Sequence, residues 1–136
     1  MRKAVKKGED SMFLIKRITD PRLAERVCGS FGVFEKGAFA YAAYKGEDVL
    51  ATAAFFTAPG GCCTLCGVDT GRRTDIPMID GIARAAFSTQ LKAGAKTARL
   101  GEGIPQDVQF ALTKLGYRAG EEFGLAEFFA RKPCSK

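Results

Sequence analysis

The sequence predicts a single α/β domain in which a mixed β-sheet carries helices on both faces. β-prone runs alternate with segments whose apolar residues recur at helical spacing, in the order β-α-β-β-β-α-β-α-β-β. The chain has 136 residues, of which 46% are hydrophobic, so it is long and apolar enough for one domain with its own core. No apolar run approaches the roughly 20 residues that cross a bilayer, which argues against a membrane partner.

Turn and capping residues set the boundaries of the expected elements. Asp20 and Pro21 suit the cap and first position of a helix, and Pro77 suits the start of another. Gly94 and Gly116 suit helix ends, because glycine adopts the left-handed conformation there without strain. Strands are expected at residues 13–19, 38–45, 49–57, 62–68, 96–100, 117–122 and 125–131, and helices from Pro21, Pro77 and near Pro105.

The net charge of +6 is concentrated at the two ends of the chain. Residues 1–11 and 131–136 together hold most of it, so the body between them is nearly neutral. We therefore expect a domain over residues 12–132, a flexible basic tail at residues 1–11 and a short tail at 133–136. Met12 is a candidate for the original start of the domain. A neutral body without a basic stripe argues against a nucleic-acid partner.

Cysteine and histidine content limits the available chemistry. The five cysteines are an odd number, and no secretory signal precedes them, which predicts a reducing, cytoplasmic location. The absence of histidine excludes a Ser-His-Asp or Cys-His pair within the chain. In an extended strand Cys63 and Cys66 point to opposite faces, so we expect them to pack as small apolar residues and expect no metal site.

Residues 62–94 form a strand, a polar loop and a helix, and they suggest an anion site. The unpaired N–H groups of a first helical turn attract anions, and the loop before Pro77 adds Arg72 and Arg73. A phosphate-bearing cofactor is the natural candidate. The alternative is that the two arginines are solvated loop charges.

The order of elements over residues 12–132 resembles the GNAT N-acetyltransferase fold, and the ending Leu115-Gly116-Tyr117 resembles a signature of that family. The resemblance implies a mostly antiparallel sheet and an acetyl-CoA or other acyl-CoA cofactor. It also implies transfer of the acyl group to an amine on a small molecule or peptide. On this resemblance, the cofactor-binding residues are Gly67, Val68, Arg72, Arg73 and Thr74.

The sequence departs from the family pattern in two segments, the pyrophosphate loop and the late helix. No glycine occupies the expected places in the pyrophosphate loop, and Leu112 stands where many members have a catalytic tyrosine. Cys66, at the end of the strand, is a candidate nucleophile, and Glu102, on a later loop, is a candidate base. These departures leave an alternative open, a non-catalytic CoA-binding or regulatory module.

The oligomeric state is left open by the sequence. An aromatic edge formed by Phe123, Phe128 and Phe129 would support a homodimer, whereas the alternative is that these phenylalanines belong to the core of one chain.

Overall fold

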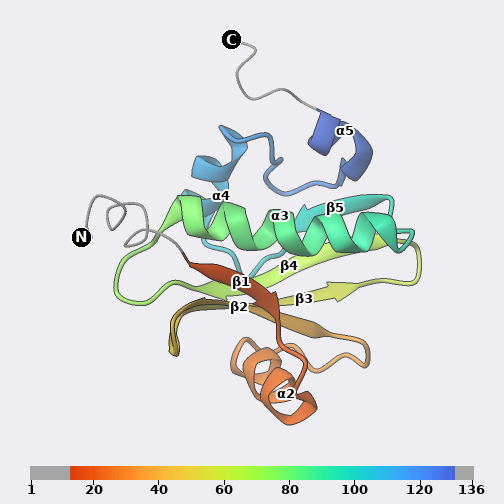
Figure 1. Cartoon of the computed structure of the whole chain (residues 1–136). Helices are drawn as coiled ribbons and strands as arrows, with labels where there is room; N and C mark the ends of the chain where they lie inside the picture. Colours follow the sequence, from red (N-terminus) through yellow and green to blue (C-terminus); the bar gives the residue numbers. More distant parts are fainter. Residues whose placement is uncertain (1–12, 131–136) are drawn as a thin grey trace, which may run out of the picture.

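A computed structural model describes residues 13–130 as one six-stranded sheet between two layers of helices (Figure 1). The tails expected at 1–11 and 133–136, and the start at Met12, lie outside the described residues. The strands are β1 (Leu14–Arg17), β2 (Phe39–Lys45), β3 (Asp48–Thr57), β4 (Cys62–Asp69), β5 (Thr97–Leu100) and β6 (Phe123–Gly124). The helices are α2 (Pro21–Ser30), α3 (Ile76–Lys92), α4 (Gln106–Thr113) and α5 (Leu125–Ala130). None of these helices is long and apolar enough to cross a membrane.

The strands lie side by side in sequence order, from β1 at one edge to β6 at the other. Neighbouring strands are antiparallel except β4 and β5, which are parallel because α3 carries the chain across the sheet between them. The predicted mixed, mostly antiparallel sheet is therefore confirmed.

The two faces of the sheet bury two separate apolar clusters. The larger cluster packs β2 side chains such as Phe39 and Tyr41 against α3, α4 and α5. The smaller cluster packs Ala40 and Ala42, the intervening residues of β2, against α2. The alternating side chains of β2 thus pack against apolar residues on both faces of the sheet, as expected for a strand whose residues are apolar on both sides.

The cap of α2 lies where the sequence places it, whereas α3 begins at Ile76, one residue before the predicted Pro77, with Asp75 as its cap. Asp20 Oδ1 accepts the amide of Arg22 at 3.0 Å, and Asp75 Oδ1 accepts the amide of Met78 at 3.0 Å. Proline follows each cap within the first two helical positions. Gly94 ends the long helix with φ +114°, a conformation that favours glycine.

The last part of the fold corrects the sequence prediction. Residues 117–122 form irregular structure between Gly116 and Phe123, and only Phe123–Gly124 pairs with β5. The expected final strand at 125–131 is the helix α5 over its described part, Leu125–Ala130. Leu125 and Phe128 are its buried residues, and their separation of three suits one face of a helix.

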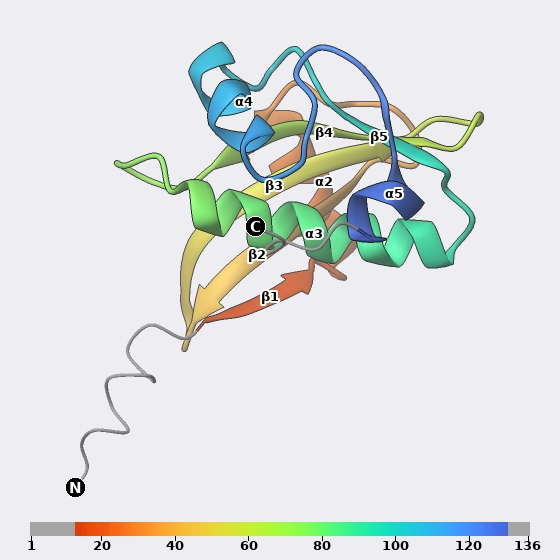
Figure 2. The same cartoon turned by 90° about the horizontal axis from the view of Figure 1, so that it is seen from above.

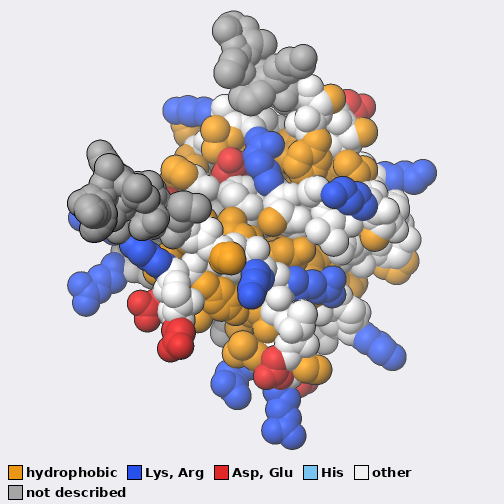
Figure 3. All heavy atoms as spheres, in the orientation of Figure 1, with side chains coloured by type: hydrophobic (Ala, Val, Ile, Leu, Met, Phe, Trp, Pro, Cys, Tyr) orange, Lys and Arg blue, Asp and Glu red, His pale blue; other side chains and the backbone are white. Residues whose placement is uncertain are grey.

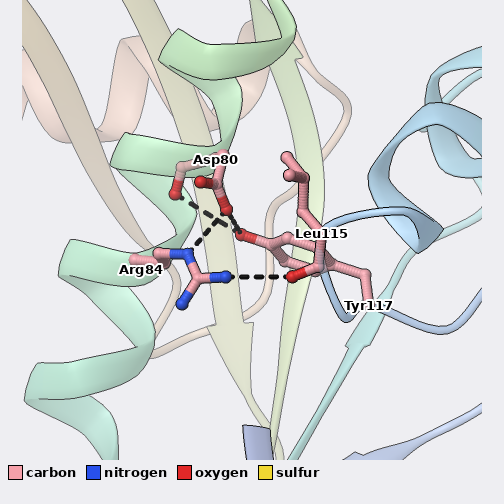
Figure 4. Close-up of polar contacts among 4 residues, drawn as sticks. All are labelled: Asp80, Arg84, Leu115 and Tyr117. Carbon is pink, nitrogen blue, oxygen red and sulfur yellow. Dashed lines mark hydrogen bonds and ion pairs between the residues drawn. The ribbon is translucent and has the colours of Figure 1, made fainter. Parts of the chain in front are cut away.

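The C-terminal segment is anchored on α3 by a polar contact around Tyr117 (Figure 4). The hydroxyl of Tyr117 donates to Asp80 Oδ1 at 2.7 Å, and Arg84 Nε donates to the same oxygen at 2.8 Å. Arg84 also donates to the carbonyl of Leu115 at 3.0 Å, and its guanidinium lies over the ring of Phe128. This contact ties the end of α4 and α5 to the middle of α3.

Candidate functional site

A bulge in β4 marks the centre of the candidate site. Ala54 of β3 pairs with Gly67 and Phe55 pairs with Leu65, so Cys66 is an extra residue on β4. The parallel ladder with β5 covers residues 62–65 of β4 and 97–100 of β5. Within the described chain, β4 therefore continues from Cys66 with β3 as its only strand partner. On the β5 side, no strand of the described chain pairs with residues 67–69.

The loop between β5 and α4 folds against this bulge. The amide of Gly101 donates to the Leu65 carbonyl at 2.9 Å, and a Cβ on Gly103 would lie 2.5 Å from the Cys66 carbonyl oxygen. The buried side chain of Gln109 holds the loop, donating to the Ile104 carbonyl at 2.9 Å. The loop carries the exposed Glu102 between the two glycines.

On the face of the sheet that α2 covers, the chain leaving α2 packs against the same part of β4. A Cβ on Gly67 would lie 2.5 Å from the ring of Phe31, so glycine permits this close approach. Phe31 is the C-cap of α2 and opens the loop that leads to β2. Two loops from different parts of the sequence thus meet at the bulge.

The loop between β4 and α3 is braced by its own side chains. Thr70 Oγ1 donates to the Arg73 carbonyl at 2.7 Å and accepts the amide of Asp75 at 3.1 Å. Gly71, at φ +87°, donates its amide to Asp69 Oδ1 at 2.9 Å. Figures 1 and 2 both place this loop at the end of the molecule where α4 lies.

The braced loop presents amides and cations together. The amides of Arg72, Arg73, Thr74 and Ile76 have no acceptor among the described residues. The side chains of Arg72, Arg73 and Thr74 are exposed. The structure therefore brings these three predicted residues together just before α3, and Gly67 and Val68 lie in the strand that leads into them. Such an arrangement can hold an anion.

A carboxylate occupies part of the same helix end. Asp75 accepts the Met78 amide, and Pro77 has no N–H to offer. In the first turn of α3, the amide of Ile76 is therefore available to an anion. Pro77 and Met78 offer no free N–H group. A phosphate bound here would rely on the loop amides and guanidinium groups more than on the helix terminus.

Cys66 lies on the α2 face of the sheet, packed against the smaller apolar cluster with Cys28. Burial raises the pKa of the Cys66 thiol to about 11, and the Glu35 carboxylate and Cys28 add to the increase. The group is therefore a thiol at neutral pH, and its surroundings do not activate it as a nucleophile.

Glu35 is a second carboxylate close to the bulge that the sequence analysis missed. It is exposed on the loop that begins with Phe31, and its charge acts on the Cys66 thiol. No local pattern marks Glu35, because its position depends on the packing of Phe31 over Gly67. Glu35 and Glu102 lie on the two loops that meet at the bulge.

No tyrosine occupies the family acid position. Leu112 is fully buried in the larger cluster. Tyr117 is 3% exposed, and its hydroxyl is engaged by Asp80. Burial and that hydrogen bond raise the pKa of Tyr117 well above its ordinary value. Tyr117 is a core residue, as its place after a helix end predicts.

The other site predictions concern metal and dimer contacts. Cys63 faces the larger cluster whereas Cys66 packs on the smaller one, so they point apart as predicted. Among residues 13–130 no three cysteine or carboxylate side chains are grouped to hold a metal.

Phe123 and Phe128 are buried within the chain and Phe129 packs on them, so these rings belong to the core. The homodimer stays a prediction.

The buried thiol of Cys63 predicts a loss of stability in alkali. Burial raises its pKa from the ordinary 9 to about 12. Between these values the unfolded chain releases the proton and the folded chain keeps it. The free energy of unfolding therefore falls by up to about 1.4 kcal/mol per pH unit as pH rises above 9. Urea unfolding at several pH values measures this slope, and Cys63→Ala should reduce it. An unchanged slope in that variant would refute the assignment.

Comparisons with known proteins identify the fold. No protein-family model and no curated protein sequence matches the chain. Among solved structures, the IAA acetyltransferase from Bacillus cereus superposes with a TM-score of 0.57 at 17% identity, covering 76% of this chain and 74% of that one. A GNAT-family acetyltransferase from Staphylococcus aureus gives 0.55 at 10% identity, covering 77% of this chain and 84% of that one.

A third solved structure agrees with these two. A GNAT-family protein from Desulfovibrio desulfuricans, described as a putative acetyltransferase, gives a TM-score of 0.52 at 15% identity, with 83% of this chain and 96% of that one covered. The chain therefore has the fold of the GNAT acetyltransferases, as the order of its elements predicts.

Proposed function

We propose that the protein is a divergent GNAT-like acyltransferase that moves an acetyl or other acyl group from acyl-CoA to an amine. The observation that carries the proposal is the bulge at Cys66 followed by the edge of β4 that pairs with no strand. This edge leads directly into the loop that presents Arg72, Arg73 and four unpaired amides. The GNAT-like fold supports the choice of acyl-CoA among phosphate-bearing cofactors.

In this proposal each part of the site has one task. The diphosphate of CoA lies against the loop amides and the guanidinium groups of Arg72 and Arg73, with Thr74 beside them. The pantetheine arm follows the edge of β4 at Gly67 and Val68, where a backbone N–H group directed away from β3 polarises the thioester carbonyl. The amine nitrogen attacks the carbonyl carbon, and the C–S bond breaks to release CoA thiolate.

Proton transfer requires a base near the bulge. An amine at neutral pH is mostly protonated and must lose a proton before it attacks. Glu102 and Glu35 are the exposed carboxylates on the two loops that meet there. Because positioning a reactive thioester accounts for much of the rate, the missing tyrosine at Leu112 need not abolish catalysis.

A non-catalytic CoA-binding or regulatory module is the second candidate. The carboxylate of Asp75 at the end of α3 and the buried Leu112 favour it. Such a module binds CoA through the same loop and releases no thiol from acyl-CoA.

Two measurements separate the candidates. Thermal unfolding with millimolar CoA reports binding, since a ligand at 100 times its Kd stabilises the fold by about 2.7 kcal/mol. Thiol release from acetyl-CoA with a panel of primary amines and basic peptides reports catalysis. The proposed enzyme gives both a stabilisation and an amine-dependent release. Stabilisation without release favours the module, and no stabilisation at all contradicts both candidates.

A further inference from the structure

A cavity lies at the β1 edge of the sheet, away from the bulge. The cavity has a volume of about 620 Å³ and is formed by β1, the start of α2 and the turn that joins β2 to β3. Small-molecule sites in proteins commonly have volumes of 300–1,000 Å³. Because β2 and β3 separate β1 from β4, the cavity is distinct from the candidate acyl-CoA site.

The floor of the cavity is apolar and open to solvent. Leu14 is 51% exposed and Leu23 is 36% exposed, although both are large apolar residues. Ile18 and Tyr44 also line the cavity. Figure 3 shows hydrophobic side chains at the surface on the face where β1 lies, with Lys and Arg side chains around them. Exposed apolar patches of this kind often mark binding sites.

The rim of the cavity is positively charged. Lys16, Arg17 and Lys45 line it together with one acidic residue, Asp20. The Asp20 carboxylate is engaged as the cap of α2, accepting amides from Arg22 and from Leu23.

The basic residues differ in their availability to a ligand. The guanidinium of Arg17 lies over the ring of Phe39, 4.6 Å from its centroid. Lys16 has no hydrogen bond or ion pair with another described residue. The ammonium of Lys16 is therefore the group best placed to meet an anion.

We propose that this cavity binds a small amphipathic carboxylate, with its hydrocarbon chain on Leu14, Ile18 and Leu23 and its carboxylate at Lys16. The apolar floor requires a hydrocarbon body, and the positive rim requires a negative head group. The concave shape favours a single small molecule over a membrane surface. The first turn of α2 offers the ligand no free amide. Pro21 has no N–H group, and the amides of the next two residues donate to Asp20.

The test uses octanoate as the probe and the full-length, ¹⁵N-labelled protein. Octanoate is expected to shift the amide signals of residues 13–20 and 44–46 with saturation. Octylammonium has the same chain and the opposite charge, and it should bind at least tenfold more weakly. Lys16→Gln should weaken octanoate binding roughly tenfold, as loss of a charge-assisted contact predicts. Lys92→Gln, at the far end of α3, is the matched control and should bind as the original protein does.

Several results would overturn the proposal. Equal binding of octanoate and octylammonium, or unchanged affinity in Lys16→Gln, would remove the role of the positive rim. Shifts confined to β4 and α3 would place the ligand elsewhere. Binding to anionic phosphatidylglycerol vesicles without binding to octanoate would identify a membrane contact instead. Leu23→Asp keeps the cation and places a carboxylate on the floor, so retained octanoate binding in this variant would also contradict the proposal.

Discussion

Replacing Phe87 by alanine is expected to lower the free energy of unfolding by about 3–5 kcal/mol. The ring is fully buried on α3 and contacts Phe55, Tyr117, Phe123 and Phe128, with centroid distances of 6.0–6.5 Å. Alanine leaves a cavity at the point where the sheet, α5 and the segment around Tyr117 meet. A loss of this size is a large fraction of the stability of an ordinary domain.

Urea unfolding followed by circular dichroism measures this loss. Phe110→Ala is the matched control, because the ring of Phe110 is 64% exposed on α4 and should change stability by less than about 1 kcal/mol. Phe87→Leu fills part of the space and keeps the experiment interpretable if the alanine variant does not fold. A loss below 1 kcal/mol in Phe87→Ala would contradict the central position of this ring.

The double substitution Arg72→Ala with Arg73→Ala is expected to weaken CoA binding by roughly 10- to 100-fold. Charge-assisted hydrogen bonds to phosphate contribute more than neutral ones, and both guanidinium groups are exposed beside the unpaired loop amides. The two side chains make no hydrogen bond or ion pair within residues 13–130, so stability should change little. Calorimetric titration with CoA measures the affinity. Equal affinity in the double variant would place the diphosphate elsewhere.

Asp75→Asn, at the same helix end, is expected to change CoA affinity in the opposite direction. Asparagine caps helices about as well as aspartate, so the contact with the Met78 amide is retained. The substitution removes a negative charge beside the proposed diphosphate, and CoA affinity should rise several-fold. An unchanged affinity for CoA in Asp75→Asn would show that the phosphates lie away from the start of α3.

The sequence could predict those parts of the fold in which local pattern and packing agree. The alternation of Phe39, Ala40, Tyr41 and Ala42 predicts a strand with two apolar faces, and β2 has them. The prediction failed at residues 125–131, where phenylalanines suggested a strand. Leu125 and Phe128 instead share one helical face, because both pack on the aromatic cluster around Phe87.

Only part of the candidate site could be predicted from the sequence. Arg72, Arg73 and Thr74 lie together because they are neighbours in one loop. The bulge at Cys66 depends on the register between β3 and β4. The sequence of one strand does not determine its register with the next strand. Glu35 comes close to Cys66 through the packing of α2 on the sheet, so no spacing in the sequence predicts it.

Mapping of CoA on ¹⁵N-labelled protein tests the central claim most directly. If the loop before α3 holds the diphosphate, saturating CoA shifts the amides of Gly67, Val68 and residues 72–76, whereas amides of β1 stay in place. If CoA at millimolar concentration leaves the amides of residues 67–76 unchanged, the loop does not bind this cofactor and the acyltransferase proposal is wrong.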